Sequence, residues 1–434
     1  MDKIVINGGK PLCGKIEVSG MKNSAVAIIF GTILTEGKCI IENLPNISDV
    51  TDGLEMLQSI GAVVRQINKT TFEIDTARII PGSAPFELVR KMRASYYILG
   101  AELGRFGKAR SAYPGGCDFG GRPIDQHIKG FEALGADVSV EGGYIDADAT
   151  QNGGLVANSV YMDVVTVGAT INIILAAVKA KGTTIIENAA REPHIVDLAN
   201  FLNAAGASIS GAGTDVIKIK GVARLHGVNY AIVPDMIEAG TYMIAAAATH
   251  GDLYINNVIP KHLESITAKL EEMGAVVEEY DEAVRVYCTE KPLTRVNVKT
   301  LPYPGFPTDM NPQMGVLLCL AKGTSTLSEG VWETRFKYVD ELRSMGASVN
   351  VDGRIAVFEG GTVFSGAVVK AVDLRAGAAM IIAGLAANGK TEIEEIQHIQ
   401  RGYENIVGKL KGVGADIKMI SVPASAITDT KKAN

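Results

Sequence analysis

One phrase recurs six times along the chain, always as a Gly-Ala pair followed by a short alternating stretch. The pairs are spaced by 74, 71, 68, 72 and 68 residues and begin at Gly61, Gly135, Gly206, Gly274, Gly346 and Gly414. Self-similarity at a nearly constant period indicates a fold assembled from copies of one supersecondary unit. The 434-residue chain is therefore expected to consist almost entirely of six repeats of about 70 residues.

Each repeat contains two kinds of helical segment. Before the glycine, "LESITAKLEEM" (263–273) places Leu263, Ile266 and Leu270 on one face and charged residues on the other. Gly274 then stands where a helix ends in a left-handed cap, and an alternating strand follows. Farther upstream in a repeat, stretches such as "NIILAAV" (172–178) are apolar on every side, which predicts a helix buried in a core. We expect an α/β fold with three repeats in each of two lobes.

Charge and hydropathy exclude several classes of partner. The net charge of −6 provides no basic surface for nucleic acid, and a DNA-encircling ring, which can also have six repeats, would need a basic bore. The apolar runs are shorter than the roughly 18 residues that span a membrane, and the N-terminus has no signal-peptide pattern. Five cysteines without paired spacing predict a reducing cytoplasm, and no Cys or His spacing indicates a metal site.

The segment "PGGCDFGGRP" (114–123) sets Cys117 among glycines and prolines close to Arg122, which indicates a reactive thiol rather than a core residue. Polar residues also gather where the buried helices should begin, and helix N-termini attract anions. Together with these helix starts, six bases predict a cleft for a small, multiply charged anion: Lys22, Arg93, Arg122, Arg335, Arg375 and Arg401.

Local structural roles are an alternative for several of these positions. Asn23 and Ser24 are good helix N-caps, and Arg375 could form an ion pair with Asp373. Asp309, between two prolines, could be a turn residue, and Arg401 could be a solvated charge at a helix end.

Seven longer phrases resemble the UDP-N-acetylglucosamine 1-carboxyvinyltransferase family almost end to end. They are "GMKNSA" (20–25), "VRKMRAS" (89–95), "PGGCDFGGRPIDQH" (114–127), "IIENAAREPHIVDLANFL" (185–202), "PGFPTDM" (304–310), "VDLRAGAA" (372–379) and "HIQRGYE" (398–404). The resemblance implies the two-lobed inside-out α/β barrel of the enolpyruvyl transferases. One lobe would be residues 22–231 and the other 1–21 with 232–420, followed by a polar tail, 421–434.

The same resemblance implies transfer of enolpyruvyl from phosphoenolpyruvate to the 3-hydroxyl of UDP-N-acetylglucosamine, with release of phosphate and without a cofactor. This would be the first committed step of bacterial peptidoglycan synthesis. Cys117 matches the general acid that also forms a covalent adduct, and Asp309 matches the candidate base at the sugar hydroxyl. Lys22 and Arg401, with Arg122, match residues that hold phosphoenolpyruvate. Further expected substrate contacts are Asn23, Arg93, Pro123, Ile124, Asp125, Gln126, Thr166, Val167, Gly168, Val331, Arg335 and Arg375.

Four positions depart from the commonest pattern of the family. Val164 stands where many members have Lys and Thr166 where many have Ser, Met236 stands where Arg is usual, and Trp332 where Phe is usual. These features resemble the second paralogue of some low-GC Gram-positive bacteria. Two alternatives remain: a catalytically weak regulatory paralogue that binds UDP-N-acetylglucosamine, and EPSP synthase, which shares the fold and donor but lacks the cysteine loop. The sequence does not indicate an oligomeric state.

Overall fold

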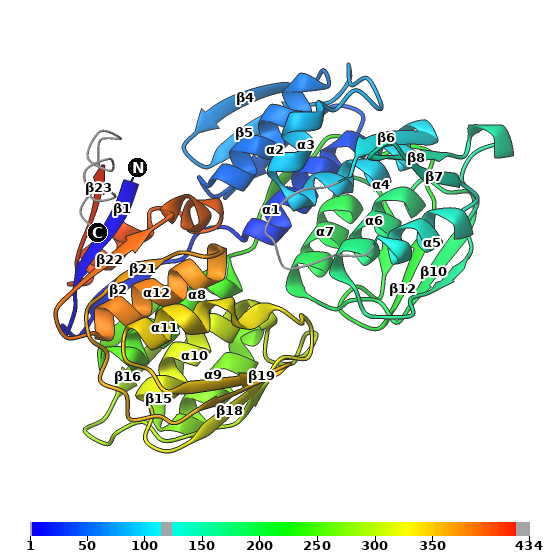
Figure 1. Ribbon diagram of the computed structural model, residues 1–434. Coiled ribbons are helices and arrows are strands. Elements are labelled where there is room, and N and C mark those ends of the chain that lie inside the picture. Colours follow the sequence, from blue (N-terminus) through cyan, green and yellow to red (C-terminus); the bar gives the residue numbers. More distant parts are fainter. Residues whose placement is uncertain (1, 114–123, 422–434) are drawn as a thin grey trace. The chain divides into compact units, whose positions relative to one another are not determined.

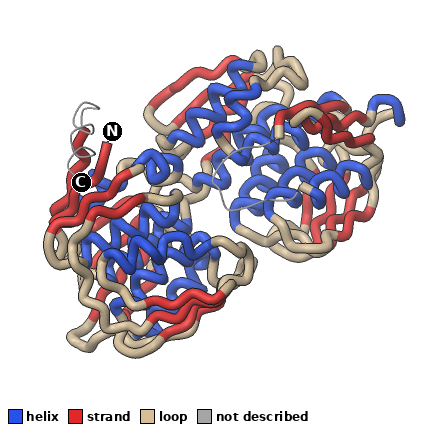
Figure 2. The backbone as a smooth tube through the Cα atoms, in the orientation of Figure 1, coloured by secondary structure: helices blue, strands red, loops and turns tan. Residues whose placement is uncertain are grey.

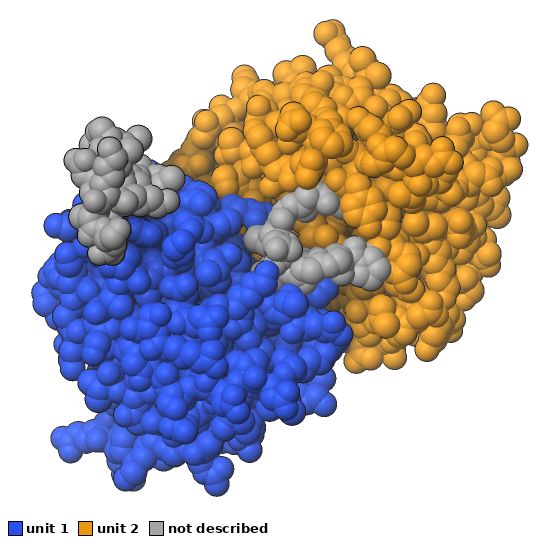
Figure 3. Space-filling view, viewed as in Figure 1, with its two compact units in different colours: residues 1–19, 234–434 blue, residues 20–233 orange. Residues whose placement is uncertain are grey.

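The computed structural model describes residues 2–113 and 124–421, which belong to two compact units (Figures 1 and 3). The middle unit runs from Gly20 to Val233, and the terminal unit combines residues 1–19 with 234–434. The expected site residues Cys117, Arg122 and Pro123 lie outside the described residues, as does the tail beyond residue 421.

The middle unit contains the helices α1 (Lys22–Gly31), α2 (Ser48–Ser59), α3 (Phe86–Lys91), α4 (Tyr97–Phe106), α5 (Asp125–Ala133), α6 (Val167–Ala177) and α7 (Pro193–Ala204). Short 3-10 turns are η1 (Thr32–Leu34), η2 (Arg93–Tyr96) and η3 (Thr150–Asn152). Its strands are β3 (Lys38–Glu42), β4 (Val63–Asn68), β5 (Thr71–Asp75), β6 (Lys108–Ala112), β7 (Asp137–Glu141), β8 (Tyr144–Asp148), β9 (Ser159–Tyr161), β10 (Thr183–Glu187), β11 (Ser208–Ser210), β12 (Val216–Lys220) and β13 (Asn229–Ala231).

The terminal unit contains the helices α8 (Met236–Ala248), α9 (Glu264–Met273), α10 (Asn311–Leu320), α11 (Val339–Ser344), α12 (Leu374–Ala386) and α13 (Ile406–Gly412). Its 3-10 turns are η4 (Pro260–Leu263), η5 (Thr308–Met310), η6 (Arg335–Tyr338) and η7 (Ile396–Arg401). Its strands are β1 (Asp2–Asn7), β2 (Cys13–Glu17), β14 (Asp252–Asn256), β15 (Ala275–Glu279), β16 (Ala283–Cys288), β17 (Val298–Lys299), β18 (Ser325–Ser328), β19 (Val349–Asp352), β20 (Ile355–Phe358), β21 (Val368–Lys370), β22 (Lys390–Glu394) and β23 (Asp416–Ser421).

Three apolar helices lie in the interior of each unit. In the middle unit α4 packs against α1 and α6, and in the terminal unit α8, α10 and α12 pack against one another. Almost all of their residues are buried, as the apolar segments predict. Close approach requires small side chains: a Cβ on Gly100 of α4 would lie 2.5 Å from the carbonyl oxygen of Asn172 in α6. Figure 2 shows the strands outside these helices in each unit, so the predicted α/β class is confirmed.

The strands form small sheets with a common plan. In the described parts of the chain, five sheets have four strands, and the sheet β6-β8-β7 has three. Each four-stranded sheet joins one parallel pair to antiparallel neighbours; β13-β3-β5-β4, for example, is parallel only between β13 and β3. The N-terminal strands complete two sheets of the terminal unit, because β2 pairs with β14 and β1 lies between β22 and β23.

The six repeat glycines adopt the left-handed conformation that their position predicts. Their φ angles run from +89° at Gly135 to +112° at Gly61, and Gly274 is the left-handed cap of α9. A side chain would be strained at such angles, which explains why glycine is the repeated residue.

A second left-handed position recurs at the ends of three strands. Asn43, Asn188 and Asn257 have φ angles of +57°, +56° and +56°. Each Nδ2 donates a hydrogen bond to a carbonyl just beyond the neighbouring parallel strand, at 2.7–2.8 Å, so the side chain closes the gap where the strands separate.

Candidate active site

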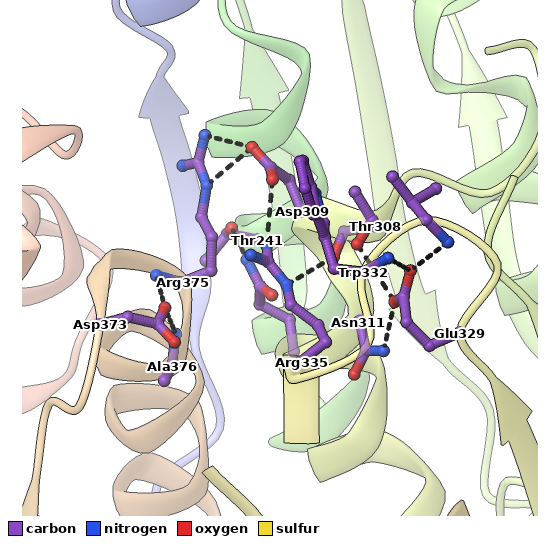
Figure 4. Close-up of polar contacts among 12 residues, drawn as sticks. Thr241, Thr308, Asp309, Asn311, Glu329, Trp332, Arg335, Asp373, Arg375 and Ala376 are labelled. Carbon is purple, nitrogen blue, oxygen red and sulfur yellow. Dashed lines mark hydrogen bonds and ion pairs between the residues drawn. The ribbon is translucent and has the colours of Figure 1, made fainter. Parts of the chain in front are cut away.

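Asp309 lies between two arginines in the terminal unit (Figure 4). It belongs to η5, directly before the buried helix α10. Its Oδ1 accepts a hydrogen bond from Nη2 of Arg335 at 3.0 Å, and its Oδ2 accepts from Nε and Nη2 of Arg375 at 3.2 and 3.1 Å. The arginine side chains are 3% and 4% exposed, whereas the aspartate side chain is 31% exposed. The carboxylate is therefore fixed by two buried cations and is still reachable from outside.

The start of α12 positions Arg375. Asp373 caps this helix by accepting hydrogen bonds from the backbone N–H groups of Arg375 and Ala376 at 2.8 and 2.9 Å. The alternative that Arg375 forms an ion pair with Asp373 is therefore wrong, because Asp373 caps the helix and the guanidinium binds Asp309. The guanidinium also lies 5.4 Å from the centre of the Tyr403 ring. Its Nη1 has no hydrogen-bond partner among the described residues, which leaves a buried donor for an anion.

Two other expected residues lie on neighbouring elements of the terminal unit. Arg401 is the last residue of η7, which packs against α12, the helix that carries Arg375. Val331 lies in the loop between β18 and η6, and this loop leads to Arg335 at the start of η6. Glu329, to which no sequence pattern pointed, binds the backbone of this loop from a buried position.

Lys22 begins α1 in the middle unit. Its Nζ lies 2.9 Å from Oδ2 of Asp49 in the first turn of α2, and both side chains are largely buried. Asn23 and Ser24 lie inside the first turn, while Met21 occupies the N-cap position without a side-chain cap. The capping alternative for these two residues is therefore wrong. No local sequence pattern pointed to Asp49, because its partner is contributed by a different helix.

Arg93 begins a stack of side chains at the start of η2. Its guanidinium lies 5.5 Å from the centre of the Tyr96 ring, and that ring meets His127 edge-on at 4.8 Å. A Cβ on Gly168, the second residue of α6, would lie 2.5 Å from the Tyr96 hydroxyl. The segments η2, α5 and α6, which carry several of the expected substrate contacts, are thus brought together.

Asn172 fixes this arrangement from inside α6. Its Nδ2 donates to Nδ1 of His127 at 2.8 Å and to the carbonyl of Tyr96 at 3.1 Å, while its Oδ1 accepts from the N–H of Gly100 at 3.0 Å. Burial, reinforced by the charge of Arg93, lowers the pKa of His127 to about 3. The imidazole is therefore neutral at physiological pH, and its position indicates a structural role.

Gln126 binds the loop that leads into α6. Its Oε1 accepts from the N–H of Asp163 at 3.0 Å, and its Nε2 donates to Oδ2 of the same residue at 3.1 Å and to Asp125 at 2.9 Å. Thr166 is the N-cap residue of α6, and Val167 is its first residue. The first N–H groups of a helix have no intrahelical acceptor, so this end can bind an anion. The side chain of Gln126 therefore holds the loop that supports that end.

The other expected contacts and three of the departures have varied surroundings. Ile124, just before α5, is buried, whereas Asp125, the first residue of that helix, is exposed. Val164 is exposed, and Met236 is buried at the start of α8. Trp332 donates its backbone N–H to Glu329 at 3.1 Å. At position 164 the chain therefore has an exposed apolar side chain where the resemblance leads one to expect a base.

The two units therefore carry different kinds of chemical group. The middle unit carries Lys22, Arg93 and two helix N-termini, which suit phosphate groups. The terminal unit carries a reachable carboxylate that can accept a proton and a buried arginine donor. In the part of the chain that is described, no cluster of three or more His, Cys, Asp or Glu residues could hold a metal ion. The helices described there are also too short or too polar to cross a membrane.

Comparison with known proteins identifies the family. The family model described as EPSP synthase (3-phosphoshikimate 1-carboxyvinyltransferase) matches residues 6–410. UDP-N-acetylglucosamine 1-carboxyvinyltransferase 3 of Caldanaerobacter subterraneus subsp. tengcongensis is 55% identical over 417 residues, which cover 96% of this chain and 99% of that protein. UDP-N-acetylglucosamine 1-carboxyvinyltransferase 2 of Bacillus cereus is 52% identical over 435 residues and 100% of both chains. The chain belongs to the UDP-N-acetylglucosamine 1-carboxyvinyltransferase family.

Solved structures of enolpyruvyl transferases have the same fold. The enolpyruvyl transferase NikO from Streptomyces tendae superposes with a TM-score of 0.87 at 26% identity, covering 97% of this chain and 99% of NikO. EPSP synthase from Acinetobacter baumannii has a TM-score of 0.72 at 19% identity, covering 97% of this chain and 100% of that one. The second likeness shows the fold alone.

Proposed function

We propose that this protein transfers the enolpyruvyl group of phosphoenolpyruvate to the 3-hydroxyl of UDP-N-acetylglucosamine and releases phosphate. Relatives at 52–55% identity over nearly the whole chain have this acceptor in their names. The observation that carries the proposal is Asp309, a reachable carboxylate fixed by two buried arginines, because the reaction must remove a proton from a hydroxyl beside an anionic donor. The protein would then catalyse the first committed step of peptidoglycan synthesis in a bacterial cytoplasm.

The reaction balances as an addition followed by an elimination. The sugar oxygen bonds to C2 of phosphoenolpyruvate while its proton passes to Asp309, and C3 of the donor receives a proton. The bond between C2 and the phosphate oxygen then breaks, and C3 loses a proton, so that the enol double bond forms again. Cys117, outside the described residues, is the proposed acid at C3 and the proposed site of the covalent adduct.

Substrate binding in this proposal follows the distribution of positive charge. Lys22 and Arg401, with Arg122, hold the donor, and the buried Nη1 of Arg375 supplies a further hydrogen bond to an anionic oxygen. Arg93 and the starts of α5 and α6 bind the diphosphate of the nucleotide sugar. The fixed donors that hold phosphoenolpyruvate compensate the charge that develops on its leaving phosphate.

The deciding experiment measures phosphate release from phosphoenolpyruvate with and without UDP-N-acetylglucosamine. We expect acceptor-dependent release by the wild type, and a loss of about 10²- to 10⁴-fold in Asp309→Asn if this carboxylate is the base. Asp340→Asn, which changes an exposed aspartate of the same unit, is the matched control. No acceptor-dependent release by the wild type would contradict the proposal. Calorimetric binding of the nucleotide sugar without release would favour the regulatory alternative, and turnover of shikimate 3-phosphate would favour EPSP synthase.

A further inference from the structure

Glu329 is a buried carboxylate beside the candidate base, and it is absent from the set of residues expected from the sequence. It follows β18 and is 2% exposed. Its Oε2 accepts hydrogen bonds from Nδ2 of Asn311 at 2.8 Å and from the hydroxyl of Thr308 at 3.1 Å (Figure 4). These two residues flank the segment that contains Asp309, so this oxygen holds the start of α10.

The other carboxylate oxygen binds a different segment. Oε1 of Glu329 accepts from the backbone N–H groups of Val331 at 2.8 Å and Trp332 at 3.1 Å. Three residues farther along, Arg335 donates from Nε to the carbonyl of Thr308 at 3.2 Å and from Nη2 to Asp309. The loop 329–335 is therefore attached to η5 at both ends, by Glu329 at its beginning and by Arg335 at its end.

We infer that Glu329 is a positioning residue for the transfer reaction, an inference that rests on the proposed function. It fixes the loop carrying Val331, an expected contact of the acceptor, relative to Asp309, the candidate base. A buried carboxylate held by four neutral donors costs free energy that an apolar side chain of similar size would avoid. What the carboxylate provides is geometry, because four donors from two segments converge on its two oxygens.

Glu329→Gln distinguishes between the two segments that Glu329 holds. The Gln carbonyl oxygen can still accept from Val331 and Trp332, but its Nε2 then faces Nδ2 of Asn311, and two donors oppose each other. Asn311 is oriented by its own Oδ1, which accepts from the Tyr338 hydroxyl at 2.8 Å. In the double variant Glu329→Gln/Asn311→Asp, a donor at position 329 again faces an acceptor at position 311, and the total charge of the two side chains is unchanged.

We expect Glu329→Gln to lower kcat about 10- to 100-fold, since small displacements of reacting groups have effects of this size. The double variant should recover most of this loss, and its KM for phosphoenolpyruvate should stay near the wild-type value. Glu333→Gln, on the same loop but 79% exposed, is the matched control and should keep wild-type kcat. A wild-type kcat in Glu329→Gln, or a double variant as impaired as the single one, would overturn the inference.

The only tryptophan of the chain provides a readout that does not depend on turnover. Trp332 lies on the loop that Glu329 holds, so acrylamide quenching of its fluorescence should increase in Glu329→Gln. In the double variant the quenching should return to the wild-type value. Unchanged quenching would contradict the attachment, whereas an inactive wild type would contradict the proposed function alone. If Glu329→Gln does not fold, Thr308→Val removes one of the four hydrogen bonds, and a wild-type kcat in that variant would overturn the inference.

Discussion

Replacing Glu395 with asparagine should stabilise the terminal unit. Glu395 has a φ of +58°, a left-handed conformation that asparagine tolerates better than glutamate does. It stands where three other repeats have asparagine at nearly the same angle. In each of those repeats the side chain donates to the residue that directly follows the parallel strand: Ile232 after β13, Met162 after β9 and Val18 after β2.

The corresponding acceptor for residue 395 is the carbonyl of Ala371, which directly follows β21. The backbone is already arranged alike, because the N–H of Ala371 donates to the carbonyl of Glu394 at 2.9 Å. A new hydrogen bond contributes about 1 kcal/mol and the better backbone preference roughly 0.5 kcal/mol. Against this stands the lost ion pair with Lys370, which joins two exposed side chains and contributes about 0.5 kcal/mol. The free energy of unfolding should therefore rise by about 1 kcal/mol.

Thermal unfolding followed by Trp332 fluorescence measures this change, because the only tryptophan of the chain lies in the terminal unit. For a unit of this size, about 1 kcal/mol should raise the midpoint by roughly 2–4 °C. The control is the reverse exchange in the same unit, Asn257→Glu, which loses the bond to Val18 and should lower the midpoint by a similar amount. A midpoint that falls in Glu395→Asn would refute the reasoning from the repeats.

Other predictions concern protonation and the site. Burial raises the pKa of Glu102 to about 7, so the folded protein holds this proton more tightly than the unfolded chain does, and the free energy of unfolding should fall as pH rises from about 4.5 to 7. Glu102→Gln should remove this fall, which amounts to up to about 3 kcal/mol. Hydrogen exchange of α4 at pH 5 and pH 8.5 measures the change, and a difference between variant and wild type that is the same at both pH values would contradict the prediction. Gln126→Glu sets a carboxylate against Asp163 and should weaken UDP-N-acetylglucosamine binding about tenfold in calorimetry, while the KM for phosphoenolpyruvate stays unchanged. Arg375→Lys cannot reproduce the paired bonds to Asp309 and should lower kcat/KM for phosphoenolpyruvate at least tenfold; a smaller loss in steady-state assays would count against the buried donor.

Features that depend on neighbouring residues could be predicted from the sequence. The repeat glycines and the apolar helices are local signals, and the structure confirms both. The left-handed asparagines were also present in phrases such as "IIEN", at Asn43 and Asn188, but one repeat alone does not reveal their conformation.

The contacts that organise the site could not be predicted in this way. Glu329 in "LSEGVWETRF" has the appearance of a solvated charge, and only the fold brings Thr308 and Asn311 to it. The pairing of Gln126 with Asp163 joins residues 37 positions apart. For the same reason the alternative of an ion pair for Arg375 named its near neighbour Asp373, while the observed partner, Asp309, is 66 positions away.

Three of the bases expected to bind substrate already have acidic partners. Lys22 lies against Asp49, and Arg335 and Arg375 share Asp309, all within largely buried surroundings. Leaving a buried cation uncompensated would cost several kcal/mol, so these carboxylates allow the cations to be present before substrate arrives. Under the proposed function, an incoming phosphate or carboxylate therefore joins or replaces an existing partner instead of neutralising an isolated charge. The net gain from each contact is then smaller than a count of charges suggests, and selectivity depends on whether the anion offers more acceptors in the right places than one aspartate does.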